Sequence, residues 1–154
     1  MAEEQGTLGT LSYAELPRVA ELEAIVFPEP LGLAALKRLY RDPSVRSLAI
    51  REGGRLAAYF GFQVAGPTAH VLANVTDPLY WGRGYGGRIL REAEPLARAM
   101  GARWFLGEVR VSNTRQQAVL RRIGWREIGR CPAFFGNGED AIVVFHCFDE
   151  VKGP

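Results

Sequence analysis

The chain has 154 residues, of which 47% are hydrophobic, and its formal net charge at pH 7 is +2. This length fits a single domain, residues 1–154, with an ordinary hydrophobic core. The small charge gives no indication of nucleic-acid binding, no apolar run approaches the ~18 residues that span a membrane, and no leader is recognisable, so we expect a cytoplasmic protein.

Two helices are predicted near the N-terminus. Apolar residues recur at helical spacing over about residues 15–27. Ser12 and Glu15 have the spacing of a capping box, but Pro17 is tolerated only in a first turn, which puts the helix start near Ala14 or Glu15 and disfavours the box. A second, shorter helix is predicted over residues 31–40, because Pro43 stops it.

Three strands are predicted to follow. Residues 45–51 and 55–64 flank Gly53 and Gly54, which are typical of a hairpin turn. A break at Pro67 precedes the third strand, residues 70–76. Strands joined by such short turns form an antiparallel meander.

The middle of the chain predicts a strand–helix–strand unit. The helix covers residues 86–100, with Gly101 as its terminator and a kink at Pro95. The strand after it covers residues 103–110. A right-handed crossover would make this strand parallel to the one at residues 70–76.

The remaining residues predict one helix and two strands. Ser112 or Asn113 caps a helix over residues 114–123. The strands are residues 125–131 and 140–148. The fold class is therefore α+β, with a mixed, mostly antiparallel central sheet that contains one βαβ unit.

A glycine-rich turn connects the third strand to the central helix. Gly82, Gly84, Gly86 and Gly87 allow tight turning and close approach of a ligand to the backbone. The free N–H groups and the dipole of the following helix favour an anion there. The turn therefore predicts a phosphate-binding site.

The same glycines also fit a dinucleotide-binding motif. Gly82, Gly84 and Gly87 satisfy GxGxxG, and Glu108 lies near the position of the ribose-binding acid. Only about 45 residues follow Glu108, which is too few for a second mononucleotide-binding half. Three antiparallel strands also precede the motif, whereas it normally opens the domain. This interpretation is therefore disfavoured.

Four segments together resemble the GNAT superfamily of N-acetyltransferases: TDPLYWGRGYGGRIL, EVRVSN, AVLRRIGW and EDAIVV. The resemblance covers residues 11–145. Within the superfamily, the chain is most similar to protein N-terminal acetyltransferases, typified by the bacterial ribosomal-protein alanine acetyltransferases. The resemblance implies a GNAT fold, an acetyl-CoA co-substrate without a metal, and an amine acceptor such as a protein N-terminus.

The resemblance also implies which residues bind acetyl-CoA. Asn74, Val75 and Thr76 would pair with the pantetheine arm, and Asn113 would bind CoA as well as cap a helix. Backbone amides of the glycine turn would hold the pyrophosphate: Gly82, Arg83, Gly84, Tyr85, Gly86 and Gly87.

Acetyl transfer requires a neutral amine as the nucleophile. An α-amino group with a pKa of ~7.7 to 8.0 is ~10 to 20% neutral at pH 7, whereas a lysine is neutral in fewer than about one molecule per thousand. Glu108 lies at the position of the family's catalytic glutamate, which implies a general base that acts directly or through water. As a purely structural residue, Glu108 would pair with Arg110 or Arg103.

The chain departs from the family at its usual proton donor. Leu120 occupies the position of the family's tyrosine that protonates the thiolate, and Phe134 and Phe135 replace the pair of tyrosines often found before the final strand. Water, Tyr80 or Tyr85 could substitute. The two phenylalanines could line an acceptor pocket or pack in the core.

Trp81 replaces the glutamine or arginine that starts the family's loop. Arg83 could take over its phosphate contact, and Trp81 could stack on adenine or pack at the sheet edge. His70 and His146 are interpreted as ordinary strand histidines, without a metal site. Two cysteines, Cys131 and Cys147, are expected to be reduced thiols.

Three functions remain open at this point. The first is acetylation of a protein or peptide N-terminus, and the second is acetylation of a small amine. Because both tyrosine positions have lost their hydroxyl, a catalytically weak CoA-binding sensor is the third. Exposed sheet edges or helix faces could also support a homodimer.

Overall fold

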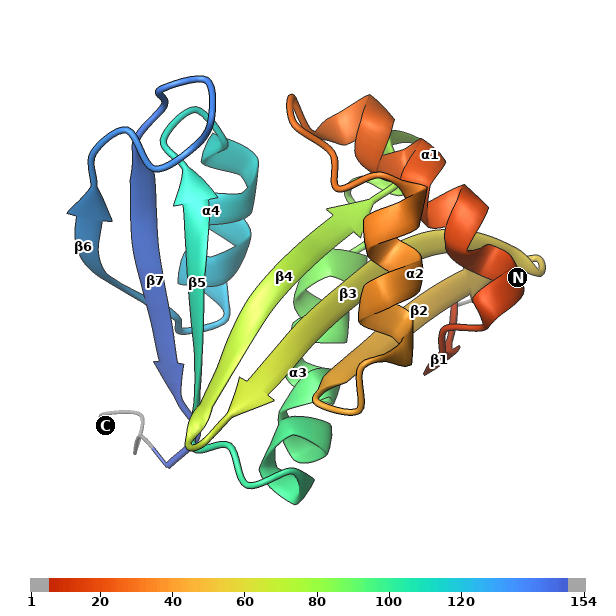
Figure 1. The fold of residues 1–154 in the computed structure, drawn as a ribbon, viewed down its shortest axis with the longest axis horizontal. Helices are drawn as coiled ribbons and strands as arrows, with labels where there is room; N and C mark the ends of the chain where they lie inside the picture. Colours follow the sequence, from red (N-terminus) through yellow and green to blue (C-terminus); the bar gives the residue numbers. More distant parts are fainter. Residues whose placement is uncertain (1–5, 150–154) are drawn as a thin grey trace. The chain divides into compact units, whose positions relative to one another are not determined.

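The computed structural model describes residues 6–149 of the chain (Figure 1). Its strands form one mixed sheet in the order β1-β2-β3-β4-β5-β7-β6. By contacts the described residues divide into two compact units, one formed by residues 6–63 and 72–93 and the other by residues 64–71 and 94–149. No helix within the described residues is long and apolar enough to cross a membrane.

The first unit is built on strands β1 (Thr7–Thr10), β2 (Val45–Glu52), most of β3 (Arg55–Ala65) and the end of β4 (Thr68–Thr76). The β1–β2 and β2–β3 pairs are antiparallel. β3 and β4 are neighbours joined by two residues, which requires an antiparallel pair as well.

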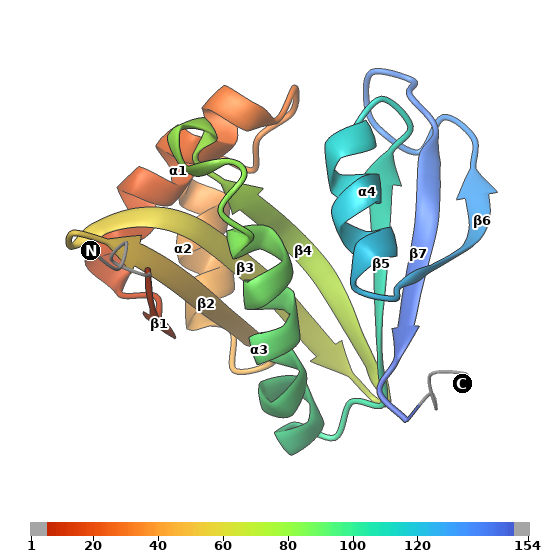
Figure 2. The ribbon, with the colours of Figure 1, turned by 180° about the vertical axis from the view of Figure 1, so that it is seen from behind.

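Helices cover both faces of this part of the sheet. α1 (Leu16–Val26) and α2 (Leu33–Arg41) lie on one face, and α3 (Tyr85–Ala99) begins on the other (Figures 1 and 2). Apolar residues of α1 and α2 form one buried cluster with residues of the strands: Leu16, Val19, Leu22, Leu36, Ala49, Leu56, Tyr59, Ala73 and Val75.

The second unit contains β5 (Trp104–Arg110), α4 (Thr114–Arg122), β6 (Arg126–Cys131) and β7 (Ala141–Cys147). β5 is parallel to the first residues of β4, which confirms the predicted βαβ unit, and antiparallel to β7. Aromatic rings fill the buried face: Phe105 stacks on Trp125 at 5.4 Å between centroids, and Trp125 stacks on His146 at 5.7 Å.

The α+β class and the mostly antiparallel sheet are confirmed, but several element boundaries differ. β1 was not predicted, because TLGT has neither a long apolar run nor clear alternation. β4 begins at Thr68, two residues before the expected start. α3 begins at Tyr85, one residue early, and continues through Pro95. The kink at Pro95 stays a prediction, as does the single domain.

The start of the first helix also differs from the expectation. A 3₁₀ turn, η1 (Tyr13–Glu15), precedes α1, with Pro17 in the first α-helical turn. The Glu15 carboxylate accepts hydrogen bonds from the backbone N–H and the hydroxyl of Ser12, each at 3.0 Å. The argument against a capping interaction was therefore wrong, because the 3₁₀ turn leaves room for the cap ahead of the proline.

Candidate active site

The glycine turn lies in the first unit, between the end of β4 and α3. Gly82 has φ +85° and Gly84 has φ +78°, a left-handed backbone that favours glycine. The Arg88 N–H donates to the Gly84 carbonyl at 3.0 Å, at the start of the helix. The earlier N–H groups of Tyr85, Gly86 and Gly87 therefore have no acceptor within the helix, as an anion site requires.

Only two of the four glycines need the left-handed conformation. Gly86 and Gly87 lie inside α3 with ordinary helical backbone, in contrast to Gly82 and Gly84. A Cβ at Gly82 or Gly84 would meet no atom within 4 Å, so the space above the turn is open on this side. The turn is thus shaped by backbone conformation and not by crowding.

The Tyr85 side chain anchors the start of α3. Its hydroxyl donates to Glu52 Oε2 at 2.7 Å and accepts the Gly6 N–H at 3.1 Å. Burial and the hydrogen bond to Glu52 raise the pKa of Tyr85. This engaged, buried hydroxyl is poorly suited to protonating a thiolate, and only the backbone amide of Tyr85 is available for ligand binding.

Arg83 projects from the turn but is already paired. Its guanidinium forms an ion pair with Glu52 and lies over the Tyr80 ring, 5.2 Å from the centroid. The hydrogen bonds from Tyr85 and from Arg83 lower the pKa of Glu52. Arg83 would have to exchange Glu52 for a phosphate in order to act as the sequence suggested.

Asn74 has a buried side-chain amide with no hydrogen-bond partner at either its oxygen or its nitrogen. Its neighbours Ala73 and Val75 belong to the core cluster, so Asn74 lies on the other face of β4. An unpaired buried amide costs free energy unless a ligand or water satisfies it. This orphaned amide fits the predicted contact with acetyl-CoA.

Trp81 connects the turn to the end of β4. Its indole Nε1–H donates to the Thr76 carbonyl at 3.0 Å, and 42% of the residue is exposed. The sequence had suggested stacking on adenine or packing at the sheet edge. The hydrogen bond was not foreseen, and it orders the strand end to which the family resemblance assigns the pantetheine arm.

Glu108 lies in the second unit and contacts His70. The His70 Nε2 atom is 2.7 Å from Glu108 Oε2 and 2.9 Å from Oε1. The pairing of β4 with β5 sets His70 opposite Leu106, two residues before Glu108 on the same face. His70 therefore lies in a strand, as expected, and its contact with Glu108 was not foreseen.

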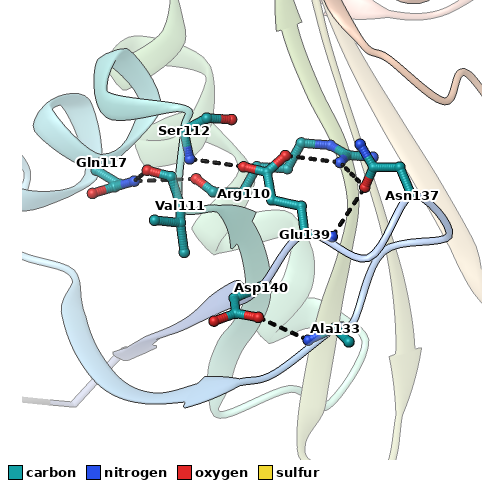
Figure 3. Close-up of polar contacts among 8 residues, drawn as sticks. All are labelled: Arg110, Val111, Ser112, Gln117, Ala133, Asn137, Glu139 and Asp140. Carbon is teal, nitrogen blue, oxygen red and sulfur yellow. Dashed lines mark hydrogen bonds and ion pairs between the residues drawn. The ribbon is translucent and has the colours of Figure 1, made fainter.

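Arg110 was an expected partner of Glu108, but it pairs with Glu139 instead. Its Nη1 atom lies 3.0 Å from both Glu139 Oε1 and Asn137 Oδ1, and Figure 3 draws both contacts as dashed lines. The other Glu139 oxygen accepts the Ser112 N–H at 2.9 Å. These contacts fix the β6–β7 loop to the corner between β5 and α4.

Two phenylalanines lie in the same loop. The Arg110 guanidinium lies 4.0 Å from the centroid of Phe135, and Phe134 meets Phe135 edge-on at 5.1 Å. Phe134 is 47% exposed, so the alternative of core packing is wrong for this residue. The loop also holds Ala133 at φ +50°, with its N–H bound to Asp140.

α4 carries the two remaining predicted positions. The Asn113 Oδ1 atom accepts the Gln116 N–H at 3.2 Å, so the predicted helix cap is confirmed. Leu120, at the position where the family resemblance implies a tyrosine, is buried within the helix. The position of the usual proton donor is thus apolar and out of reach of solvent.

Histidine and cysteine side chains elsewhere do not add a site. His146 lies 3.2 Å from Glu94, and Cys131 and Cys147 are free thiols. Within residues 6–149, no three histidine, cysteine or acidic side chains are placed to hold a metal ion. Glu52, His70 and Glu139 contribute contacts that sequence reasoning missed, because each joins residues at least 27 positions apart.

Comparison with known proteins decides the family. A model of the acetyltransferase (GNAT) family matches residues 16–125. The chain belongs to the GNAT family. It is an acetyl-CoA-dependent N-acetyltransferase, and the dinucleotide-binding interpretation of the glycine turn does not apply.

Two relatives and one solved structure illustrate the relationship. The chain is 37% identical to the N-alpha-acetyltransferase RimI of Mycobacterium tuberculosis, over 90% of each chain. It is 30% identical to a putative [ribosomal protein bS18]-alanine N-acetyltransferase of Bacillus subtilis, over 88% of this chain and 91% of the relative. The ribosomal-protein-S18-alanine N-acetyltransferase of Escherichia coli shares the fold, with a TM-score of 0.83 over 96% of both chains and 21% identity.

Proposed function

We propose that this GNAT enzyme acetylates the α-amino group of a protein N-terminus, in the cytoplasm, and that an alanine of a ribosomal protein is its acceptor. The observation that supports this most strongly is the similarity to two relatives, 37% and 30% identical, that are named for Nα-acetylation and for ribosomal-protein alanine acetylation. Both similarities extend over nearly the full length of this chain.

The proposal assigns acetyl-CoA to the glycine turn and the end of β4. The first-turn N–H groups of α3, including that of Tyr85, would receive the pyrophosphate with Arg83 beside them. The unsatisfied Asn74 amide, with Val75 and Thr76, would meet the pantetheine arm. A free anion site and an orphaned amide in the same unit support this assignment.

The proposal makes Glu108 the general base. Its carboxylate takes a proton from the acceptor ammonium, directly or through one water, so that the amine lone pair attacks the thioester carbonyl. The side chain is 18% exposed, which leaves the carboxylate accessible to a small polar group. An α-amino acceptor needs less help than lysine, because its pKa of ~7.7 to 8.0 lies closer to neutrality.

The departing CoA thiolate receives its proton from water in this account. Leu120 provides no hydroxyl, and the Tyr85 hydroxyl is engaged by Glu52. A thiol with a pKa near ~8.5 leaves as its anion at moderate cost near pH 8. We therefore expect activity without a dedicated tyrosine, at a lower rate than that of relatives that have one.

The proposal is tested by turnover on matched acceptors. The purified enzyme is incubated with acetyl-CoA and one of three acceptors: a peptide that starts with alanine, the same peptide with a blocked N-terminus and an internal lysine, or a small polyamine. Free thiol gives the rate, and mass spectrometry locates the acetyl group. We expect acetylation at the alanine nitrogen to exceed both alternatives by at least about tenfold, since only the α-amine is appreciably neutral.

Substitution of the base completes the test. Glu108→Gln should lower kcat/KM for the alanine peptide by about 10²- to 10⁴-fold at pH 7, the usual contribution of a general base. Glu127→Gln, in an exposed glutamate of β6, is the control and should match the wild type. An unaltered rate in Glu108→Gln would remove Glu108 from the mechanism, and acetyl-CoA binding without turnover on any amine would favour a sensor.

A further inference from the structure

Glu108 shares its environment with a second ionisable side chain. His70 Nε2 lies 2.7 Å from Glu108 Oε2, and the two side chains are 43% and 18% exposed. Both side chains lie on the same face of the second unit, because strand pairing puts His70 opposite Leu106. The imidazole is therefore close enough to control the orientation and the charge of the carboxylate.

Among residues 6–149, no other side chain on this face forms a hydrogen bond or ion pair with Glu108. Strand register puts Val143 directly opposite Glu108. The nearest cation on β5, Arg110, is bound to Glu139 and Asn137. Strand register also puts three titratable residues of β6 and β7 on this face: Arg126, Cys131 and Cys147. Its other members there and on β5 are apolar: Trp104, Leu106, Ala141 and Phe145.

The protonation state of His70 changes what Glu108 can do. A neutral imidazole that donates its Nε2–H to the carboxylate holds that carboxylate in one orientation and leaves its charge intact. An imidazolium at the same 2.7 Å binds the carboxylate through a charge-assisted hydrogen bond that engages its oxygen more strongly. The carboxylate is then a weaker proton acceptor for an incoming ammonium.

We propose that His70 is the positioning residue for Glu108 and that protonation of its imidazole switches this base off. The proposal rests on the proposed role of Glu108 as the base. In the transfer step the amine N–H bond breaks and the proton moves to a Glu108 carboxylate oxygen. His70 keeps its Nε2–H throughout and exchanges no proton with the substrate.

The direction of the pH dependence follows from the pair. The hydrogen bond with Glu108, partly offset by burial, raises the pKa of His70 above its ordinary value of 6.5. The ion pair is therefore fully formed below pH 6.5 and is lost as the pH rises through the pKa of the folded state. Glu108 therefore becomes active as a base as the pH rises through the pKa of His70. This gain in rate adds to the gain from deprotonation of the acceptor amine.

Two variants separate orientation from charge. His70→Gln keeps an amide donor for Glu108 but cannot ionise, so the ratio of wild-type to variant kcat/KM should fall at least about tenfold between pH 8.5 and pH 5.5. His70→Ala removes the donor, so kcat should fall at least about tenfold while KM for the peptide stays within about twofold. A constant ratio for His70→Gln, or unchanged kcat in His70→Ala, would overturn the proposal.

His146→Gln provides the matched control. This is the second of two histidines in the chain, and its Nε2 lies 3.2 Å from Glu94 on α3. Any loss of stability in this variant should lower the rate by the same factor at every pH. A pH-dependent ratio for His146→Gln like that expected for His70→Gln would contradict the assignment to His70.

A measurement on the enzyme without substrate tests the His70–Glu108 pair separately from the acetyltransferase function. The two histidines give two imidazole resonances, and NMR titration should place the His70 pKa above 6.5 in the wild type and closer to 6.5 in Glu108→Gln. A His70 pKa unaffected by Glu108→Gln would overturn the pair. Absence of peptide turnover in the wild type would contradict the proposed function and leave this titration result intact.

Discussion

At the scale of single residues, Glu23 is the least expected group in the molecule. It lies in α1 with only 1% of the residue exposed, and its Oε2 atom has no hydrogen-bond partner. Burial raises the pKa of Glu23 to about 7. The hydrogen bond that its carboxylate accepts from the backbone N–H of Leu31 lowers the pKa, but by less than burial raises it. Burial therefore stabilises the protonated form of this carboxyl group relative to an exposed glutamate.

Glu23 makes stability depend on pH. Since its pKa is higher in the folded protein than the ordinary 4.5, the folded state binds more protons between these values. The contribution of Glu23 to the free energy of unfolding is therefore largest below pH 4.5. It declines by about 3 kcal/mol in all as the pH rises towards 7. Glu23→Gln should remove this decline and raise the free energy of unfolding at pH 8, measured by urea denaturation.

Glu21→Gln is the matched control for that measurement. Glu21 lies two residues away on α1 and is 63% exposed beside Arg18. Its substitution should leave the difference in unfolding free energy between pH 5 and pH 8 unchanged. If Glu23→Gln kept the wild-type pH dependence, burial of a carboxyl group at this site would not be its source.

At the scale of elements, helix α4 depends on a residue with two proposed roles. Asn113 caps the helix through its contact with the Gln116 N–H, and the family resemblance also assigns it to CoA. Gln117 adds hydrogen bonds to the carbonyls of Arg110 and Val111, at 3.1 and 2.9 Å (Figure 3). The β5–α4 corner is thus fixed from both sides, and the two roles of Asn113 can be separated.

Asn113→Ala and Asn113→Ser should differ in stability but not in ligand binding. Alanine loses the cap at a cost of about 1 kcal/mol, whereas serine retains it. Neither side chain has the carboxamide, so both variants should bind acetyl-CoA about 3- to 10-fold more weakly, the equivalent of one hydrogen bond. Thermal unfolding and calorimetric titration measure the two effects. Wild-type affinity in Asn113→Ser would leave only the capping role.

Local patterns predicted most elements because local chemistry determines them. The segment now seen as α2 showed helical periodicity up to a proline, and the Gly53–Gly54 turn, with both residues at positive φ, marked the β2–β3 hairpin. β1 was not predicted because its four residues form a strand through pairing with β2 and not through their own strand propensity. The cap at Ser12 was misjudged because a 3₁₀ turn before an α-helix has no distinct sequence signal.

At the scale of the whole molecule, the candidate site was only partly predictable. The glycine turn and Asn113 could be found from sequence, since each acts through its own stretch of backbone. The contacts between Glu52 and Arg83 and between His70 and Glu108 join residues 31 and 38 positions apart. Such contacts depend on the register and connection of strands, which the composition of either segment does not encode.

The central claim is that the glycine turn binds the pyrophosphate of acetyl-CoA, and Gly84→Ala tests it most directly. Gly54→Ala is the control, because Gly54 has the same φ of +78° and equally open surroundings, but lies in the β2–β3 turn. Both substitutions should lower stability by about 1 kcal/mol, the cost of a left-handed alanine.

Isothermal titration with acetyl-CoA then compares the two variants with the wild type. The Kd for acetyl-CoA should rise about tenfold in Gly84→Ala and stay within about twofold of the wild type in Gly54→Ala. The reason is that only the substitution at Gly84 strains the backbone amides proposed to bind the phosphate. Equal affinities in the wild type and both variants would show that acetyl-CoA does not depend on this turn and would contradict the claim.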